Sequence, residues 1–481
     1  MDFSSSMSDC HHRVHVVAIP YPGRGHINAM LNSCRLLAPQ RPGLLITLLV
    51  TEQWLALILE DLQQHPRAPA LPSNIHLRTI PNVLPSETTR TDNFHAFFEA
   101  VFTKMEPPVA SLLDHLHNPP AAVISCIIAD TLLPWAVALG NQRSIPVASL
   151  WPMSSTAYSI FNHAHLLRAH GHHPINVTEN GDTSVCYFPG VSSIRLGDLP
   201  NSLRGRDSPV LPRLQEAVAW VPKAQCLLLA SFQRLEPNAT DAIKAHLHRL
   251  LPVYAVGPFI SSTDPDPNGC SNTDYCQWLD SKAEQTVLYV SFGSYLGVSG
   301  PQLEEIAVGL RASGVHFLWA SGRADRKHLQ EVCGEKGLVV AWCDQLRVLC
   351  HPSIRAFFTH CGWNSTMEAV FAGVVMLAFP LGAEQYTNAK LIVEDWKVGV
   401  RVKREMLLGS DDADVVGREE IAGIVKRVMD LEGNEGREMK RRAEQLQESC
   451  RTAIGSGGSS NTNINAFVRE FLFGHFSSQH G

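Results

Sequence analysis

Short apolar runs alternate along the chain with longer stretches in which apolar residues recur every three or four positions. The runs are rich in Val, Ile and Leu without polar alternation, which is typical of strands buried on both faces of a parallel sheet. In the first half the predicted strands are Val14–Pro20, Leu44–Thr51, Ile75–Pro81, Ser125–Asp130, Val147–Trp151, Cys226–Ser231 and Val253–Gly257. In the second half they are Thr286–Phe292, His316–Ala320, Leu338–Trp342, Ile354–Thr359, Val374–Phe379 and Val398–Val402.

The longer stretches predict helices between these strands. Examples are Ile27–Ala38, Phe94–Met105, Pro301–Ala312, Ser365–Ala372, Gln385–Trp396, Arg418–Asp430, Glu435–Ile454 and Ile464–Phe473. Strands that alternate with helices in this way form parallel sheets covered by helices on both faces. The pattern therefore predicts an α/β fold built from doubly wound parallel sheets.

The chain has 481 residues, more than a single hydrophobic core usually serves. Its best linker candidate is the stretch 257–275, which is dense in Pro, Gly, Asp and Ser. We therefore predict an N-terminal domain (1–256), a linker (257–275), a C-terminal domain (276–460) and a C-terminal helix and tail (461–481). The last segment is expected to pack back on the N-terminal domain.

Composition narrows the function classes. The formal net charge is −6 and no long basic block occurs, which argues against a nucleic-acid surface. The locally basic Arg437–Arg442 lies among glutamates, so we interpret it as a solvated helix face. Twelve cysteines show no CxxC and no zinc-type spacing, so neither a disulfide framework nor a structural metal is expected. The polar N-terminus resembles no signal peptide and no window reaches the ~20 apolar residues of a membrane span, so we expect a cytoplasmic protein.

One predicted strand end in the second half suits an anion. Strand Ile354–Thr359 leads into His360, and a helix is predicted to begin near Cys361–Ser365. The first N–H groups of a helix lack partners and carry partial positive charge, which favours a pyrophosphate. Gly362 would let the backbone approach, and His360, Asn364 and Ser365 could donate hydrogen bonds. Taken alone, this pattern is more commonly that of an Asn or Ser helix cap with a capping carboxylate.

Neighbouring strand ends add complementary groups. Trp342 could stack on a base beside Cys343 and Gln345, although a core Trp is the alternative. Glu368 could accept from a ribose. Glu384 and Gln385 could hold sugar hydroxyls, and their alternative is an ordinary helix start. Ser294 could hold a phosphate, and its alternative is a turn residue. Taken together, these strand ends predict a nucleotide-sugar site.

The first half offers a catalytic pair. Strand Val14–Pro20 runs through a GRG turn to His26 at the start of a predicted helix, where the dipole disfavours the imidazolium. Asp130 ends another strand and could hold the second ring nitrogen of this histidine, as in a general-base pair. The alternatives are a structural histidine and a helix-capping aspartate. A dinucleotide site would need a third glycine where Asn28 stands, and an acidic residue at a later strand end, which is absent.

The segment Trp342–Gln385 resembles the signature box of plant family 1 UDP-dependent glycosyltransferases. Its W-x-x-Q start, its HCGWNS core, the downstream Glu368 and the final Glu-Gln all match. The likeness extends to PYPGRGHIN near the start, to SFGS and to GGSS before the last helix. The resemblance implies a GT-B fold, with two Rossmann-like domains facing a cleft and the donor held mainly by the C-terminal one.

The resemblance also implies roles for the candidate residues. Trp342 would stack on uracil, whose edge would bond the backbone of Cys343, while Gln345 and Glu368 would hold the ribose. The phosphates would contact Ser294, His360, Asn364 and Ser365 near Gly362, and the sugar would contact Trp363, Glu384 and Gln385. His26 would be the catalytic base and Asp130 its partner. A final Gln usually accompanies glucose donors in this family.

The chain departs from the family pattern at three positions. Asp344 and Val375 each stand where Pro is common, and Ala29 follows HIN where Pro is also common. We expect Asp344 to loosen the loop after Trp342 and to add a charge near the base. No proposed contact is removed by any of the three.

We therefore predict an inverting glycosyltransferase that moves glucose from UDP-glucose to a hydroxyl of a small apolar acceptor, such as a flavonoid, terpenoid, hormone or other phenolic. No cofactor or metal, no nucleic acid and no other subunit is expected. The acceptor pocket is expected to use aromatic residues of the first half, most of which could equally be core. They are Phe94, Phe97, Phe98, Phe102, Trp151, Met153 and Phe188. The alternatives are a catalytically silent nucleotide-sugar-binding protein and a nucleotide-dependent oxidoreductase.

Overall fold

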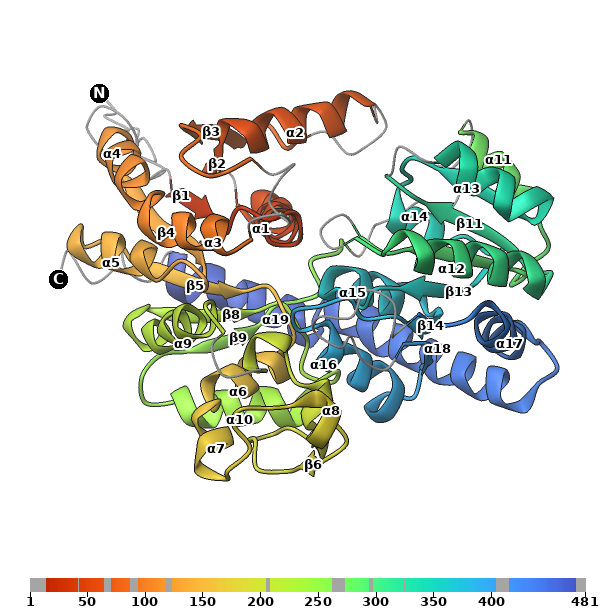
Figure 1. Ribbon diagram of the computed structural model, residues 1–481. Helices are drawn as coiled ribbons and strands as arrows, with labels where there is room; N and C mark the ends of the chain where they lie inside the picture. The colour runs from red at the N-terminus through yellow and green to blue at the C-terminus, as the bar shows by residue number, and fades with distance from the viewer. Residues whose placement is uncertain are drawn as a thin grey trace, which may run out of the picture. The chain divides into compact units, whose positions relative to one another are not determined.

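The computed structural model describes residues 14–41, 43–64, 71–86, 94–117, 123–204, 208–261, 273–293, 297–322, 326–403 and 415–472. Parallel sheets flanked by helices dominate these residues, as the apolar runs predict (Figure 1).

The first sheet has seven strands in the order β3-β2-β1-β4-β5-β8-β9. They are β1 (Val14–Ile19), β2 (Leu44–Thr51), β3 (Ile75–Ile80), β4 (Ile124–Asp130), β5 (Val147–Trp151), β8 (Cys226–Leu229) and β9 (Val253–Ala255). Strand β1 pairs in parallel with both β2 and β4, so the chain reverses its direction of travel across the sheet at β1. The carboxyl ends of β1 and β4 therefore lie side by side, which is where ligands of such sheets bind.

Helices connect these strands. They are α1 (Arg24–Leu37), η1 (Ala38–Gln40), α2 (Glu52–Gln64), α3 (Phe94–Thr103), α4 (Glu106–Leu116), α5 (Pro134–Gln142), α9 (Leu211–Trp220), η5 (Val221–Lys223) and α10 (Pro237–Leu247). Helix α1 begins three residues before the predicted start because Gly23 and Arg24 already belong to the turn that opens it.

The stretch between β5 and α9 holds short elements that sequence periodicity did not predict. They are α6 (Ser155–Asn162), α7 (His165–Ala169), α8 (Val177–Asn180), the antiparallel pair β6 (Ser184–Val185) and β7 (Ile194–Arg195), η3 (Leu196–Asp198) and η4 (Asn201–Leu203). Apart from α6, which has eight residues, these elements have two to five residues and are too short to show a repeating apolar pattern.

The second sheet has six strands in the order β12-β11-β10-β13-β14-β15. They are β10 (Val287–Ser291), β11 (His316–Ala320), β12 (Gly337–Val340), β13 (Ile354–Thr359), β14 (Val375–Ala378) and β15 (Gly399–Arg401). The helices that accompany them are α11 (Asp274–Asp280), α12 (Gly300–Ser313), α13 (Arg326–Cys333), η7 (Gly334–Lys336), α14 (Gln345–Leu349), α15 (Trp363–Ala372), α16 (Gln385–Lys390), η8 (Leu391–Asp395), α17 (Arg418–Met429), α18 (Asn434–Ile454), α19 (Ser459–Ala466) and η9 (Phe467–Leu472).

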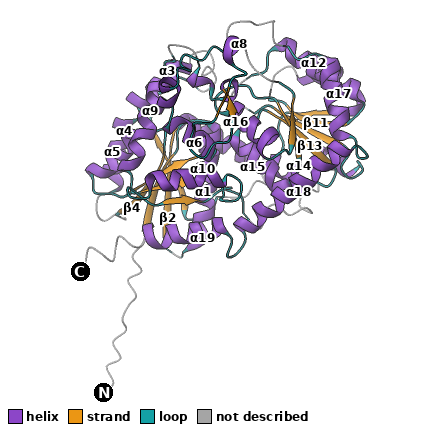
Figure 2. Cartoon of the chain, turned by 90° about the horizontal axis from the view of Figure 1, so that it is seen from below, coloured by secondary structure: helices purple, strands orange, loops and turns teal. Residues whose placement is uncertain are grey.

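Both faces of this second sheet are buried, which explains its unbroken apolar strands (Figure 2). Val290 and Phe358 face a cluster that includes α12 and α17. Their strand neighbours Tyr289 and Phe357 face a second cluster that includes α15 and α18. Successive side chains of a strand point to opposite faces, so one six-strand sheet serves two apolar layers.

The chain divides into two compact units. The first contains the residues up to Leu150, with 223–227 and those from Ile464 on, and the second contains Trp151–Pro222 and Leu228–Asn463. The boundaries 1–256, 257–275, 276–460 and 461–481 stay a prediction. The final helix begins at Ser459, five residues earlier than expected, where Ser460 Oγ donates to Gly257 O and anchors it.

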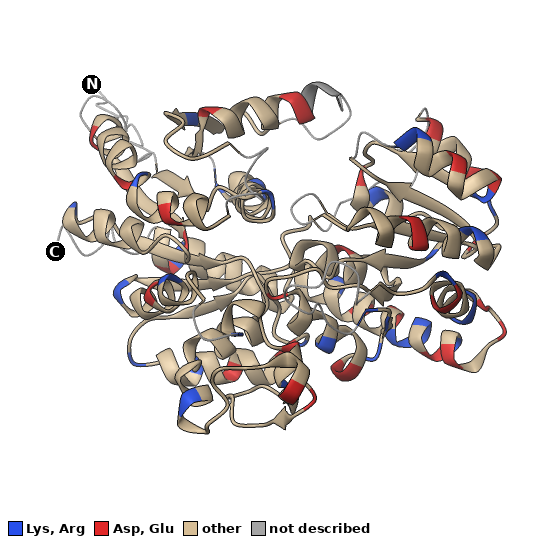
Figure 3. Ribbon diagram, in the orientation of Figure 1, with Lys and Arg blue, Asp and Glu red and all other residues tan. Residues whose placement is uncertain are grey.

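Basic and acidic residues both occur along the exposed helix α18, as the ribbon colours of Figure 3 show. Glu438 accepts from both Arg441 and Arg442, so the basic run is a paired helix face, as interpreted from the sequence. Within the described ranges, no helix is long and apolar enough to cross a membrane. Among the described cysteines, Cys276 takes part in a disulfide bond and the other nine are free thiols.

Candidate active site

The predicted pair His26 and Asp130 meets in the structure. His26 lies in the first turn of α1 and Asp130 is the last residue of β4, and Nδ1 of the imidazole lies 2.7 Å from Oδ2 of the carboxylate. The Asp130 side chain is almost fully buried, whereas that of His26 keeps a fifth of its surface exposed. A carboxylate only accepts hydrogen bonds, so Nδ1 carries the proton and Nε2 is the basic nitrogen.

A backbone bond fixes the carboxylate of Asp130 in place. Its other oxygen, Oδ1, accepts from the N–H of Leu132 at 2.9 Å. The capping alternative fails in detail, because helix α5 begins only at Pro134 and none of its own N–H groups is bound by Asp130. Asp130 is therefore locked in a turn and turned towards His26.

A row of aromatic rings continues from His26. The ring of Tyr21 lies 5.0 Å from that of His26 and 6.2 Å from that of Phe98, which in turn lies 5.7 Å from Phe94. Phe98 is buried and Phe94 is partly exposed. The other aromatic and sulfur side chains expected in the acceptor pocket are buried, in agreement with the alternative that they belong to the core. These are Phe97, Phe102, Trp151, Met153 and Phe188.

At the end of β13, His360 lies between two glycines. A Cβ on Gly293, at the end of β10, would come within 2.7 Å of His360 Nε2, and a Cβ on Gly362 would come closer still. Burial lowers the pKa of His360 from 6.5 to about 4, so the ring is neutral at pH 7. This arrangement brings an imidazole nitrogen, without a charge, to the start of α15.

The N-cap of α15 is Gly362, which has no side chain, so the Asn or Ser N-cap considered from the sequence is not formed. The preceding residue Cys361 has a positive φ of 64°, and its carbonyl accepts from the buried side chain of Asn388 at 2.9 Å. The turn is thus held from α16, and its N-cap residue offers no side chain to the first helical N–H groups. Asn364 and Ser365 lie in this first turn.

Gln345 links the start of α14 to α15. Its Nε2 donates to Ser365 Oγ at 2.8 Å and to Glu368 Oε2 at 2.7 Å, and its Oε1 accepts from the Tyr289 hydroxyl at 3.3 Å. Burial raises the pKa of Glu368 from 4.5 to about 7. Tyr289, whose hydroxyl also accepts from the Cys343 thiol, was not predicted as a site residue, because within a buried strand it has only the signature of a core aromatic.

Trp342 follows β12 and keeps 43% of its surface exposed, so the core alternative is wrong for it. The neighbouring Cys343 is buried. The sequence led us to expect that Asp344 loosens this loop. In the structure it instead caps α14, because its Oδ1 accepts from the N–H of Arg347 at 3.2 Å. The loop that presents Trp342 is therefore tied down by the residue that replaces proline.

Trp363 is placed in the core. Its indole N–H donates to Ala230 O at 2.7 Å and its side chain is 3% exposed. Of its polar groups, only the backbone at the first position of α15 is left to reach a sugar. Any contact between Trp363 and a ligand is thus a backbone contact.

Glu384 and Gln385 stand at the start of α16. Gln385 Oε1 accepts from the N–H groups of Leu381 and Gly382, at 2.8 and 3.1 Å. These two donors fix the amide so that Nε2 is the group Gln385 can offer to a ligand. Ser294, the remaining phosphate candidate, lies outside the described residues.

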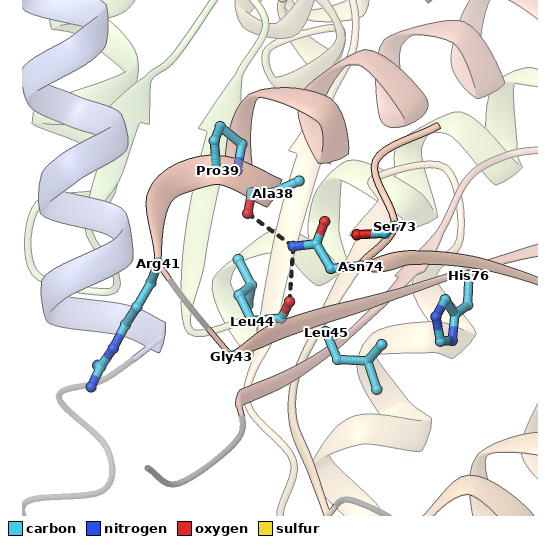
Figure 4. Close-up of a pocket in the computed structure, with 9 residues that line it drawn as sticks. All are labelled: Ala38, Pro39, Arg41, Gly43, Leu44, Leu45, Ser73, Asn74 and His76. Carbon is cyan, nitrogen blue, oxygen red and sulfur yellow. Dashed lines mark hydrogen bonds between the residues drawn. The ribbon is translucent and has the colours of Figure 1, made fainter. Parts of the chain in front are cut away.

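A separate hollow of about 600 Å³ lies at the amino ends of β2 and β3, lined by Leu44, Asn74 and His76 among others (Figure 4). Asn74 Nδ2 donates there to Ala38 O and Leu44 O. The hollow is at the opposite strand ends from His26 and Asp130, so it has no part in the candidate site. Among the described residues, no group of three or more His, Cys, Asp or Glu side chains could hold a metal ion.

Two parallel sheets of Rossmann type, with the candidate donor residues at the strand ends of the second, are the architecture of GT-B glycosyltransferases. The family model for UDP-glucoronosyl and UDP-glucosyl transferases matches residues 244–416. The chain is 46% identical to UDP-glycosyltransferase 87A2 of Arabidopsis thaliana over 95% of its length and 96% of the relative's, and 45% identical to UDP-glycosyltransferase 87A1 of the same plant over 94% and 99%. It belongs to the plant family 1 UDP-glycosyltransferases and is a UDP-sugar-dependent glycosyltransferase.

Solved structures agree. Medicago truncatula UGT71G1, complexed with UDP-glucose, superimposes with a TM-score of 0.79 at 25% identity and covers 97% of this chain and 100% of its own. Phytolacca americana UGT2, complexed with UDP-2fluoro-glucose and pterostilbene, gives a TM-score of 0.78 at 25% identity and covers 95% and 99%. The oxidoreductase and the catalytically silent alternatives are thereby set aside.

Proposed function

We propose that the enzyme transfers glucose from UDP-glucose to a hydroxyl of a small apolar acceptor, with inversion at the anomeric carbon. The observation that carries the proposal is the 2.7 Å contact between His26 Nδ1 and the buried Asp130 carboxylate. It leaves Nε2 of a partly exposed imidazole as a base.

The step is a single displacement. His26 Nε2 takes the proton of the acceptor hydroxyl while its oxygen forms a bond to the anomeric carbon, on the face opposite the departing UDP. The bond between that carbon and the phosphate oxygen breaks, and UDP leaves with the electron pair. The Asp130 carboxylate stabilises the imidazolium that results.

The charge that develops on the departing diphosphate meets the uncapped start of α15. Helix N–H groups provide preorganised donors there, beside the neutral ring of His360, and this is the kind of stabilisation that usually contributes most to such steps. This supports a mechanism that needs no metal ion.

Glucose is favoured by the end of the signature box. Gln385 offers an amide N–H beside the carboxylate of Glu384, a donor and an acceptor suited to neighbouring sugar hydroxyls. The glucose-containing donors seen with the Medicago truncatula and Phytolacca americana enzymes are consistent with this choice.

The acceptor is proposed to be apolar because a row of aromatic rings begins beside His26. Tyr21 contacts His26, and the partly exposed Phe94 ends the same row, so a flat apolar molecule with one hydroxyl would find rings to pack against. Pterostilbene in the Phytolacca americana structure is a molecule of this type.

The test is a His26→Ala variant assayed with UDP-glucose and UDP-galactose against a panel of phenols, terpenoid alcohols and flavonoids. We expect transfer to fall by at least ~10²-fold, the usual contribution of general-base catalysis, while UDP affinity stays within a few-fold. Asp130→Asn should lose less activity than His26→Ala. Retained turnover by His26→Ala would remove His26 from the base role, and a preference for UDP-galactose would overturn the donor.

A further inference from the structure

The helix that carries Gln385 is held along one side by a distant part of the chain. This part comprises residues 192–204, which include β7, η3 and η4, and we call it the 192–204 segment. It belongs to the same compact unit as α16. Helix α16 presents Ala383, just before its start, and Tyr386, Thr387 and Lys390 on one side, because residues three and four apart lie on one face. Each of these four contacts the 192–204 segment.

The first contact is a backbone hydrogen bond. The N–H of Asn201 donates to Ala383 O at 3.2 Å. Ala383 has a positive φ of 52°, a conformation that costs a non-glycine residue free energy and persists only when the surroundings hold it. Glu384 and Gln385 follow directly, so a strained residue sets the direction of both side chains.

Three more contacts follow along the helix. The guanidinium of Arg204 lies 4.2 Å from the ring centre of Tyr386. Thr387 Oγ1 donates to the backbone carbonyl of Asp198 at 2.8 Å. The Lys390 ammonium is 1% exposed and donates to Ser192 Oγ and to the carboxylate of Asp395.

Asp198 anchors the 192–204 segment. Its side chain has no exposed surface, and it accepts from Arg195 Nε at 2.8 Å, from Arg195 Nη2 at 3.0 Å and from Arg401 Nη1 at 2.7 Å. Arg401 ends β15, so the carboxylate ties the segment to the second sheet. Buried charge-assisted bonds of this kind fix geometry strongly, because breaking one leaves an uncompensated charge.

The opposite side of α16 faces the donor site. Gln385 Oε1 binds the turn at Leu381 and Gly382, and Asn388 Nδ2 binds Cys361 O in the phosphate-binding turn. A displacement of α16 would therefore move the sugar-binding pair relative to the start of α15. The ribose and base groups are carried by other elements, since Gln345 begins α14 and Glu368 lies in α15.

We propose that the 192–204 segment is a positioning element for the donor sugar, with Asp198 as its anchor and the Asn201 N–H as its contact with the strained residue before Glu384. The proposal rests on the proposed role of Glu384 and Gln385 in holding the sugar. It makes Asn201 and Asp198 positioning residues that set affinity for the sugar of UDP-glucose, but not for UDP.

The sharpest test is a pair of variants at one position. Asn201→Pro removes the N–H that bonds Ala383, and proline is tolerated there because Asn201 is the first residue of η4 and Pro200 is extended, with ψ 133°. Asn201→Ala changes the side chain and keeps the N–H, so it is the matched control. Both keep the ion pairs of Asp198.

We expect Asn201→Pro to raise the KM and the Kd for UDP-glucose roughly 2- to 10-fold, the range of one hydrogen bond, and to lower the preference for UDP-glucose over UDP-galactose. The Kd for UDP should stay within about 2-fold, and Asn201→Ala should match the wild type. Thr387→Val, which removes only the hydroxyl bonded to Asp198 O, should act in the same direction. A purely structural role would weaken UDP and UDP-glucose equally.

Thermal unfolding shows whether each variant is folded, and Thr387→Val carries the test if Asn201→Pro is not. Unchanged UDP-glucose affinity in a folded variant, or an equal loss for UDP, would overturn the proposal. A wild-type enzyme that binds UDP-glucose no better than UDP-galactose would instead count against the proposed donor. The two failures are therefore distinguishable in the same titrations.

Discussion

Glu368 shows how burial at the donor site changes the chemistry of one residue. Its pKa is raised to about 7, so the folded protein holds this proton more tightly than the unfolded chain does. The contribution of Glu368 to the free energy of unfolding is then full below about pH 4.5 and is lost as the pH rises through about 7. We predict that Glu368→Gln, which cannot ionise, gains in Tm relative to the wild type as the pH rises from 5 to 8.

Glu305→Gln provides a control of opposite sign. Hydrogen bonding to Arg418 lowers the pKa of Glu305, so its contribution is present above pH 4.5 and is lost in acid. The variant should be less stable than the wild type at neutral pH and approach it at low pH. If the Tm of Glu368→Gln followed that of the wild type at a constant offset, the raised pKa of Glu368 would be refuted.

Residues with a polar group at a strand end could be predicted from the sequence. His26 and Asp130 meet as expected, and Gln345 and Glu368 are bonded to each other. Asn388 and Asp198 could not be predicted, because their partners Cys361 and Arg401 are reached only after folding. The exposure of Trp342 was also open, since an aromatic residue after an apolar strand suits a core as well as a ligand.

Among the elements, α14 depends on a cap that the family pattern would replace by proline. Asp344 has φ −69° and ψ 97°, which proline can adopt, and its carboxylate accepts from the N–H of Arg347. We predict that Asp344→Ala lowers the free energy of unfolding by about 1 kcal/mol, the usual value of an N-cap. Asp344→Pro restricts the unfolded chain but also removes the Asp344 N–H, which donates to the Tyr275 hydroxyl at 3.4 Å, so it should lose at least as much stability.

Chemical denaturation of the two variants measures this order, with UDP affinity as the check on the donor site. We expect the Kd for UDP to stay within about 2-fold in both, because Trp342 and Gln345 keep their own supports. A smaller loss of stability for Asp344→Pro than for Asp344→Ala would mean that the hydrogen bond to Tyr275 contributes little in solution. A gain in stability for Asp344→Ala would show that Asp344 does not cap the helix in solution.

The strands were predicted to within one or two residues because burial on both faces leaves unbroken apolar runs, as in β13 and β5. The elements between β5 and α9 were not predicted, because they are short and are stabilised by partners that are distant in the sequence. Glu236 illustrates this, since its buried carboxylate accepts from the N–H groups of Ser155 and Thr156 at the start of α6. Nothing near Ser155 in the sequence indicates that partner.

The residues proposed for proton transfer and those proposed for donor binding belong to different compact units of the chain. His26 and Asp130 belong to the first unit, and the candidate donor residues from Trp342 to Gln385 belong to the second. A ligand that binds only the folded state stabilises it according to its concentration and affinity, by about 2.7 kcal/mol at 100 times its Kd. Donor binding can therefore be measured as a rise in Tm without any catalytic turnover.

We predict that UDP raises the Tm of the wild type and of His26→Ala by the same amount, because neither His26 nor the Asp130 carboxylate is needed to bind the nucleotide. Trp342→Ala should show a smaller rise at the same UDP concentration. Loss of base stacking costs about 1–3 kcal/mol, and a tenfold weaker Kd would reduce the stabilisation from about 2.7 to about 1.4 kcal/mol. Equal Tm shifts for Trp342→Ala and the wild type would mean that the exposed indole does not contact the nucleotide base. Loss of the Tm shift in His26→Ala would mean that His26 acts in nucleotide binding rather than in proton transfer.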